Sequence, residues 1–436
     1  LPICILIYLP PIQNFLVDKA AVYASEATGM NISVGRISLS FPLNLVVTDV
    51  DAASPHKDTL LSVRRLQVNV QLLPLLKKQV EVDGISLQGA TVNSNDLIHG
   101  MRLNGTLGEL FISSHGVALD PETAIVNKVL LKDTDLSLCL NDTAAADTAA
   151  SDTTYWKIIL QDIDLQNVSF ALDMPLDSLS LAASLDNATL RDGLIDLHKS
   201  AYSLQTFRIK NGRVRYDSGR PSATASADSL SAGLDPSHIA LTDIGVKLDS
   251  LYYEGRNMKA VISQFVLKER SGVEIVSTEG RLVSNDKVLR VPSLKLETRD
   301  SYLELNAAMD WDALDFKKEG LVSARLMADI GKPDVVRFMG SMDEKFIRKY
   351  PSEPLRIRTG IDGDLNKLKL TTLTAELPGA LELFAKGELT SLTDSLLRGG
   401  DITLQAETKD LKFISTLAEG IEIPYGTRLE RSEEHT

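Results

Sequence analysis

The sequence has few of the residues from which catalytic and metal sites are usually built. Its 436 residues include two cysteines, Cys4 and Cys139, and six histidines. Cys4 lies in an apolar terminal run and Cys139 in a strand-like segment, so the sequence predicts neither a disulfide framework nor a Cys-x-x-Cys zinc site. No histidine stands at metal-ligand spacing from a cysteine or another histidine. We therefore expect no bound metal.

Sequence motifs for catalysis are also missing. There is no Gly-x-Ser-x-Gly elbow, no Walker loop and no Gly-x-Gly-x-x-Gly fingerprint. Asp162 and Asp164, like Asp133 and Asp135, alternate with apolar residues, so each pair is expected on the wet side of a strand. We expect a protein that is not an enzyme and needs no cofactor.

Basic runs and aromatic residues are scarce as well. The net charge is −13, and no long cluster of lysine or arginine offers replacement counterions for phosphates, so a nucleic-acid partner is not expected. Aromatic residues make up only 5% of the chain, whereas hydrophobic residues make up 44%. The buried side chains are therefore expected to be mostly valine, leucine, isoleucine and alanine.

The first residues look like the end of a membrane anchor. The run from Leu1 to Val17 is apolar and uncharged up to its end, close to the roughly 20 residues that span a bilayer. We interpret residues 1–10 as the exit end of a transmembrane signal anchor, closed by Pro10 and Pro11. Residues 11–29 are expected to form a juxtamembrane helix that ends at Gly29. The alternative is a hydrophobic terminus buried in the fold.

The last six residues resemble translated sequencing adapter rather than natural protein. Residues 431–436 back-translate to AGA-TCG-GAA-GAG-CAC-ACG, the start of a widely used sequencing adapter. We interpret these residues as a sequencing-adapter artefact, and we expect the natural protein to be longer.

From Asn31 onward, apolar and polar residues mostly alternate, which is typical of sheets with one wet face. The Ala/Asp/Thr-rich segment 141–154 predicts a loop, and apolar spacings of three and four predict a helix over 332–350. We therefore expect a mostly β protein. Its β units span residues 30–140, 155–331 and 351–430.

One pattern recurs in four copies. Two alternating apolar positions precede Gly89, Asp133, Asn167 or Asn211, and the next apolar positions follow with the opposite parity. One extra residue at the Gly/Asp/Asn site, a β-bulge, would return the apolar side chains to one face and curl the sheet. A hairpin turn at the same place is the alternative.

The front of the chain resembles the AsmA/TamB family. The resemblance rests on Ser25–Gly29, Ile32–Ile37 and Phe41–Leu43, then on Leu66–Val70, Leu73–Lys78 and Val80–Val92. From Gly363 to Ile414 the glycine-punctuated rhythm is similar to the body of these proteins, whereas between Thr106 and Ala328 only the alternation matches. The carboxy-terminal domain that defines TamB does not occur here, which leaves the choice between TamB and AsmA open.

The resemblance implies a long, curled, antiparallel β-sheet of repeated multi-strand units, a β-groove or taco. It implies an anchor in the inner membrane of a diderm bacterium and a body in the periplasm, where phospholipid acyl chains travel along an apolar groove toward the outer membrane. Exposing a 16-carbon chain to water costs about 12 kcal/mol, at roughly 0.8 kcal/mol per methylene. The candidate groove-lining residues are Ile85, Leu87, Val92, Leu131, Leu136, Ile163, Leu165, Phe170, Ile209 and Val214.

Three alternatives accompany this interpretation. The ten residues would instead fill a closed sandwich core, which is what the alternation alone slightly favours. A TamB-like factor would assist the assembly or secretion of outer-membrane β-barrel proteins through sheet edges, with a BamA-like barrel as partner of the absent carboxy-terminal domain. An enzyme of envelope polysaccharide metabolism is the third alternative.

Overall fold

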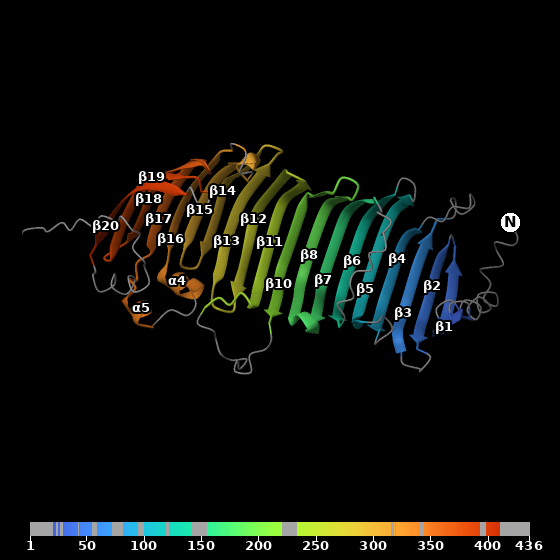
Figure 1. Cartoon of the computed structure of the whole chain (residues 1–436). Coiled ribbons are helices and arrows are strands. Elements are labelled where there is room, and N and C mark those ends of the chain that lie inside the picture. Colours follow the sequence, from blue (N-terminus) through green and yellow to red (C-terminus); the bar gives the residue numbers. More distant parts are fainter. Residues whose placement is uncertain are drawn as a thin grey trace, which may run out of the picture. The chain divides into compact units, whose positions relative to one another are not determined.

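The strands predicted by alternation make up most of the computed structural model (Figure 1). The structure describes residues 21–22, 25–26, 29–41, 43–54, 59–71, 82–94, 100–118, 122–141, 155–219, 233–314, 318, 320–339, 344–392 and 398–409. The predicted anchor end at residues 1–10 and the adapter-like residues 431–436 lie outside these ranges. Among the helices that are described, none has the length and apolar character needed to cross a bilayer. The chain divides into unit 1, residues 1–299, and unit 2, residues 300–436.

Unit 1 is built from strands that follow one another around the sheet. They are β1 (Asn31–Ser40), β2 (Asn44–Ala53), β3 (Thr59–Val70), β4 (Val82–Asn93), β5 (Met101–Ala118), β6 (Thr123–Leu140), β7 (Lys157–Met174), β8 (Leu179–Asp196), β9 (Ala201–Leu204), β10 (Thr206–Ser218), β11 (His238–Glu254), β12 (Asn257–Glu269), β13 (Glu274–Ser284) and β14 (Val288–Thr298). A short 3-10 turn, η1 (Pro175–Asp177), joins β7 to β8.

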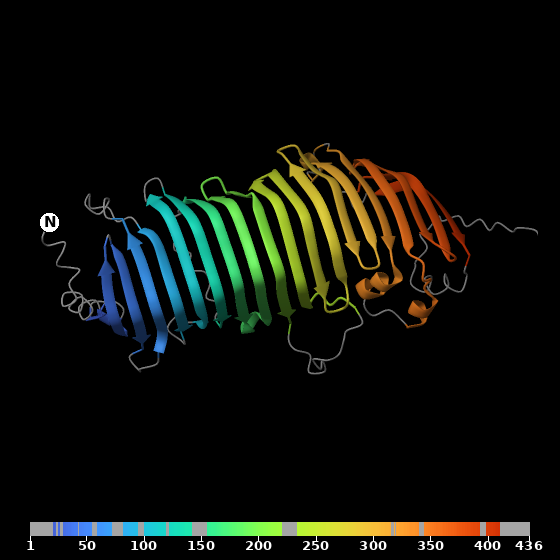
Figure 2. The same ribbon diagram turned by 180° about the vertical axis from the view of Figure 1, so that it is seen from behind.

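The strands of unit 1 pair in the order of the sequence, which Figures 1 and 2 show from opposite sides. β9 and β10 share one position, because both lie between β8 and β11. The expectation of a wholly antiparallel sheet is wrong at one place, since β6 and β7 pair in parallel. Parallel neighbours need a crossover of about a dozen residues or more, and the segment between Leu140 and Lys157 supplies that length.

The described part of unit 1 is one layer thick. Its principal contacts between elements join hydrogen-bonded neighbours along the ladder, apart from η1 against β8. No second sheet is seen to pack on either face within the described ranges. A closed sandwich, one of the alternatives raised by the alternation, therefore does not describe these residues.

The residue inserted in each repeat has a left-handed backbone. Gly89, Asp133, Asn167 and Asn211 have φ of 63°, 49°, 51° and 53°. Each lies inside a strand, β4, β6, β7 or β10, so the hairpin alternative is wrong. Glycine, aspartate and asparagine tolerate this conformation best, which explains why these residue types mark the repeat.

The inserted residues of neighbouring strands lie opposite one another in the sheet. Between β4 and β5, for example, Gln88 pairs with Glu109 and Ala90 pairs with Leu107, so the pairing continues past Gly89 without a register shift. A bulge that sets two residues against one was expected, but between most of these strands each insertion faces an insertion in the next strand. Register shifts at this level occur where β11 pairs with β10 and with β12. From β3 to β10 the inserted residues form a line across the sheet and leave the ladders intact.

Unit 2 contains six described strands and two short helices. The strands are β15 (Tyr302–Asp310), β16 (Val322–Ile330), β17 (Leu355–Asp364), β18 (Lys367–Leu377), β19 (Leu381–Thr390) and β20 (Gly399–Thr408), which pair antiparallel in this order. The turn η2 (Trp311–Leu314) follows β15, and helices α4 (Lys332–Met339) and α5 (Glu344–Lys349) lie where the sequence predicts a helix over 332–350.

Two contacts hold the helical segment of unit 2. Phe346 of α5 packs on a small core formed by Tyr350, Leu377 and Ala380. Asp334 of α4 is 1% exposed and accepts hydrogen bonds from Ser301 Oγ at 2.6 Å and Arg337 Nη1 at 3.0 Å. Because a buried carboxylate is costly unless it is paired, this network fixes the start of α4.

Candidate functional site: the apolar face of unit 1

All ten predicted lining residues lie on the same face of unit 1. The ladder register shows this directly, because directly paired residues of neighbouring strands point to the same side of a sheet. Ile85 and Ile163 belong to one row across the strands. Leu87, Leu131, Leu165 and Ile209 belong to the next, and Val92, Leu136, Phe170 and Val214 belong to a row beyond the inserted residues.

Following these rows from β3 to β11 defines what we name the apolar face. The first row is Val68, Ile85, Ile112, Val129, Ile163, Leu190, Phe207 and Leu248, and the second is Leu66, Leu87, Leu110, Leu131, Leu165, Ala188, Ile209 and Val246. The middle row is Val63, Ala90, Leu107, Thr134, Val168, Leu185, Gly212 and Ile244, and the last is Leu61, Val92, Gly105, Leu136, Phe170, Ala183, Val214 and Leu241. None of these positions carries a charge.

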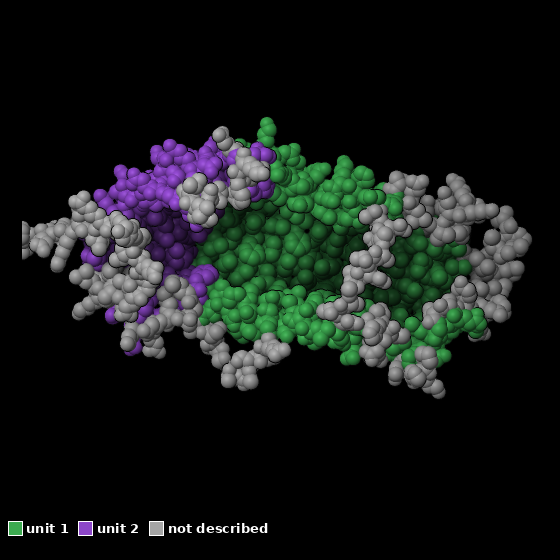
Figure 3. Space-filling view, viewed as in Figure 1, with its two compact units in different colours: residues 1–299 green, residues 300–436 purple. Residues whose placement is uncertain are grey.

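Exposure varies across the apolar face as it would in a trough. In the middle row Ala90 is 8% and Thr134 is 2% exposed, whereas Ile85 and Phe170, in the outer rows, are 37% and 38% exposed. In a one-layer sheet, only neighbours on the same face can cover a side chain, so burial of the middle row requires the side chains beside it to converge. Figure 3 shows a surface of unit 1 that is hollowed along its length.

Thr134 is the exception to the apolar character of the middle row, and its hydroxyl is satisfied locally. Its Oγ1 donates to the carbonyl of Lys132 at 3.2 Å. The middle row therefore has no unsatisfied hydroxyl at Thr134. A hydrocarbon chain that contacts this residue leaves the hydrogen bond of the hydroxyl intact.

The opposite side of the sheet, which we name the polar face, carries the charges. Arg191 Nη2 lies 3.1 Å from Asp164 Oδ1 and Nη1 also contacts Asp162, while Arg215 Nε lies 2.7 Å from Asp217 Oδ2. Asp162 and Asp164 thus form ion pairs on the wet face, where the alternation places them. These pairs are half-exposed, so each adds only about 0–1 kcal/mol of stability.

The inserted residues also direct their side chains to the polar face. Asn167 Nδ2 donates to Asp133 Oδ1 at 2.9 Å, and Asn211 Nδ2 donates to Asp186. At the corresponding level of β11, Asp243 has φ 53°, and its hydrogen bond with Lys268 Nζ at 2.8 Å raises the pKa of that lysine. The insertion therefore serves two purposes: it keeps the apolar positions on one face and joins the strands by polar contacts on the other.

Unit 2 has uncharged ladder rows of its own. Its ladder rows place Leu305, Leu326, Thr359, Leu373, Ala385 and Leu404 side by side. Ala328 and Ala385 are 1% and 2% exposed, whereas Leu404 of β20 is 58% exposed.

The repeat pattern missed the apolar-face residues of several strands. β5 and β8 contribute Leu107, Leu110, Leu185 and Leu190, although neither strand contains the full pattern. Their signal is the same change of parity, since Leu107 and Leu185 are odd whereas Leu110 and Leu190 are even. A search for parity change alone, without the turn-type residue, would have found them.

The sequence comparisons add no name to this geometry. No family model matches the chain, and no curated protein matches it either. What the fold defines is a class: a mostly β protein whose unit 1 is a one-layer sheet with an uncharged apolar face.

Proposed function

We propose that this chain is an AsmA/TamB-type protein, anchored in the inner membrane, whose apolar face carries phospholipid acyl chains across the periplasm to the outer membrane. The observation that supports the proposal is the run of uncharged rows from β3 to β11. Strands lie about 4.8 Å apart, so eight strand positions extend over roughly 34 Å. A surface of that length accommodates an extended acyl chain and lets it slide without meeting a charge.

The energetics favour a lipid over water on this surface. Monomeric soluble proteins rarely expose a continuous apolar patch beyond a few hundred Å², and larger patches mark binding surfaces. A 16-carbon chain in water costs about 12 kcal/mol, at roughly 0.8 kcal/mol per methylene, and contact with the apolar face removes much of that cost. Because the rows are apolar on every strand from β3 to β11, an acyl chain has a similar free energy at each successive position along the face. A conduit requires such similar energies, since a deep minimum would trap the lipid.

The test is to place a charge on the apolar face and to compare it with the same charge on the polar face. Leu165→Arg and Phe170→Glu place the charge among half-buried leucines, while Gln166→Arg and Ser169→Glu put the same charges one residue away on the polar face. We expect all four variants to fold, because each charge can reach water. Only the first two should lose phospholipid, measured by mass spectrometry of lipid extracted from the purified protein, with far-UV circular dichroism as the folding check.

Two results would contradict the proposal. One is unfolding of both apolar-face variants while the controls stay folded, since that is how a closed core responds to a buried charge. The other is an unchanged amount of bound phospholipid in Leu165→Arg and Phe170→Glu.

A factor that assembles outer-membrane β-barrels is the second candidate function. One observation favours it: among the described residues β20 pairs only with β19, and it exposes Ile402 and Leu404 by 43% and 58%. An open strand edge is able to pair with an extended client strand. Pairing of this kind would slow the hydrogen exchange of the β20 backbone amides when a client strand is added. Addition of lipid would leave the exchange rates of these amides unchanged.

A further inference from the structure

The polar face of unit 1 changes character over β12 to β14. There the ladder register brings four basic residues onto one side of three adjacent strands. Lys259 and Arg290 lie in one row with Val283, Arg281 lies in the next with Ser293, and Lys295 lies in the third opposite Glu279. Adjacent strands are about 4.8 Å apart, and residues two apart along a strand are about 6.6 Å apart. The four cations therefore fall within an area of roughly 10 by 13 Å, which we name the basic patch.

The cations of the basic patch differ from other cations on the same face. Arg191, Arg213 and Lys268 are each paired with a carboxylate. Lys259, Arg281, Arg290 and Lys295 are exposed, and none makes a hydrogen bond or ion pair within the described part of the chain. A local excess of unpaired positive charge in a chain of net charge −13 creates an attractive field for anions.

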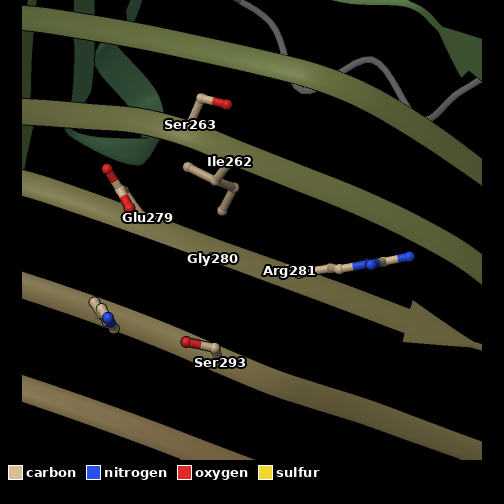
Figure 4. A pocket seen from close by; sticks show the side chains of 7 residues that line it. Ile262, Ser263, Glu279, Gly280, Arg281 and Ser293 are labelled. Atoms are coloured by element: carbon tan, nitrogen blue, oxygen red, sulfur yellow. The ribbon is translucent and has the colours of Figure 1, made fainter.

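A depression lies within the basic patch. Its volume is about 360 Å³, and it is lined by Ile262, Ser263, Glu279, Gly280, Arg281, Ser293 and Lys295. Figure 4 labels six of these residues, which come from three neighbouring strands. Gly280 contributes only backbone to the lining, because the Cβ direction of this residue points to the opposite face, toward Leu294. The cavity is large enough for a small polyatomic anion together with some of its water.

The acidic groups near the depression do not neutralise it. Glu279 stands directly opposite Lys295 in the ladder without forming an ion pair. Asp249, from β11, accepts a hydrogen bond from Ser263 Oγ and lies 3.8 Å from Lys247 Nζ, so its charge is directed toward other partners. Glu297, two residues from Lys295 on the same face, is exposed and also makes no ion pair among the described residues, so the patch keeps four cations against two unengaged carboxylates.

We propose that the basic patch is a binding site for a phosphate group that carries at least two negative charges, either on a lipid headgroup or on a soluble phosphate ester. Arg281 offers planar, paired donors that match phosphate oxygens, Lys295 adds a point charge, and Ser293 Oγ supplies a neutral donor. Lys259 and Arg290 extend the field beyond the hollow and steer the anion to it. This site lies on the face opposite the apolar face, so it stands independently of acyl-chain transport.

The first experiment uses the whole chain and inorganic pyrophosphate as the probe, with binding measured by calorimetry at low salt. Arg281→Gln combined with Lys295→Gln should weaken binding by about a hundredfold, because two charge-assisted contacts to the phosphate are lost. The matched control is Arg213→Gln combined with Lys268→Gln, which removes the same charge from paired residues of the same face and should change affinity by less than about threefold. Glu279→Gln should tighten binding, since it removes the like charge.

The second experiment identifies where the phosphate comes from. Vesicles of phosphatidylcholine with phosphatidic acid are compared with vesicles of phosphatidylcholine alone in sedimentation. Recovery of the chain with the first kind only, reversed by pyrophosphate and absent in the Arg281/Lys295 variant, assigns the site to a lipid headgroup. Pyrophosphate binding without recovery on either vesicle assigns it to a soluble phosphate ester. No binding of pyrophosphate by the unmodified chain, or an equal loss in the Arg213/Lys268 control, would overturn the proposal.

Discussion

The two faces of unit 1 share the same strands and the same backbone, yet they have opposite chemistry. On β7, Leu165 and Phe170 point to the apolar face, while Gln166 and Ser169 beside them point to the polar face. The polar face joins the strands through ion pairs such as that of Arg191 with Asp164. The apolar face offers hydrocarbon rows without charge. A one-layer sheet keeps both faces accessible, so stabilisation by polar contacts and binding by apolar contacts are separated across its thickness.

This separation depends on the inserted residues. If Asn167 had the regular extended backbone of a strand, the positions after Leu165 would alternate with the wrong parity, and Phe170 would turn to the polar face. The left-handed backbone at Asn167, with φ 51°, restores the face within one strand. The line of inserted residues therefore keeps the apolar and polar side chains on separate faces along the full length of each strand.

The largest expected effect comes from placing a charge at the most buried hydrophobic residue of the apolar face. Ala188 is 3% exposed and lies between Leu165 and Ile209 in the ladder rows. Ala188→Asp should lower the free energy of unfolding by about 3–5 kcal/mol, because the carboxylate would be buried without a partner. Ser184→Asp, on the polar face of the same strand next to Arg213, is the control and should change it by no more than about 0.5 kcal/mol. Equal urea midpoints for the two variants would show that the faces do not differ as described.

A smaller effect should follow from changing the inserted residue itself. Asn167→Ala puts a side chain with no compensating hydrogen bond at φ 51° and removes the contact with Asp133 Oδ1. We expect a loss of roughly 1–2 kcal/mol in the free energy of unfolding, most of it from the left-handed backbone. Asn167→Gly loses the same hydrogen bond but relaxes the backbone, so its urea midpoint should lie between those of Asn167→Ala and the unmodified chain. A glycine variant as unstable as the alanine variant would contradict this account of the insertion.

Much of this arrangement was predictable from the sequence because alternation is a local signal. The parity change around Gly89, Asp133, Asn167 and Asn211 predicted both the irregularity and the common face of the ten residues. The matching level of the insertions in neighbouring strands was not predictable, because it depends on register between segments that lie far apart in the sequence. The parallel pairing of β6 with β7 was missed for the same reason.

The basic patch was invisible in the sequence for a different reason. Lys259, Arg281, Arg290 and Lys295 are spread over three strands and are separated by apolar residues, so no basic run marks them. They become neighbours only through the ladder, and their lack of partners is a property of the folded sheet. Searches for clustered lysine and arginine detect local patches and overlook those that a sheet assembles.

The most direct test of the central claim is photo-crosslinking from adjacent positions of β7. A photoreactive residue is introduced at position 165, in place of Leu165, or at position 166, in place of Gln166, in cells that make the protein. The apolar-face position should yield a crosslink to phospholipid, detected as a mass shift on the purified chain, and the polar-face position should yield little or none. Equal crosslinking from both positions, or crosslinking from position 166 alone, would contradict the assignment of the apolar face as the lipid-carrying surface.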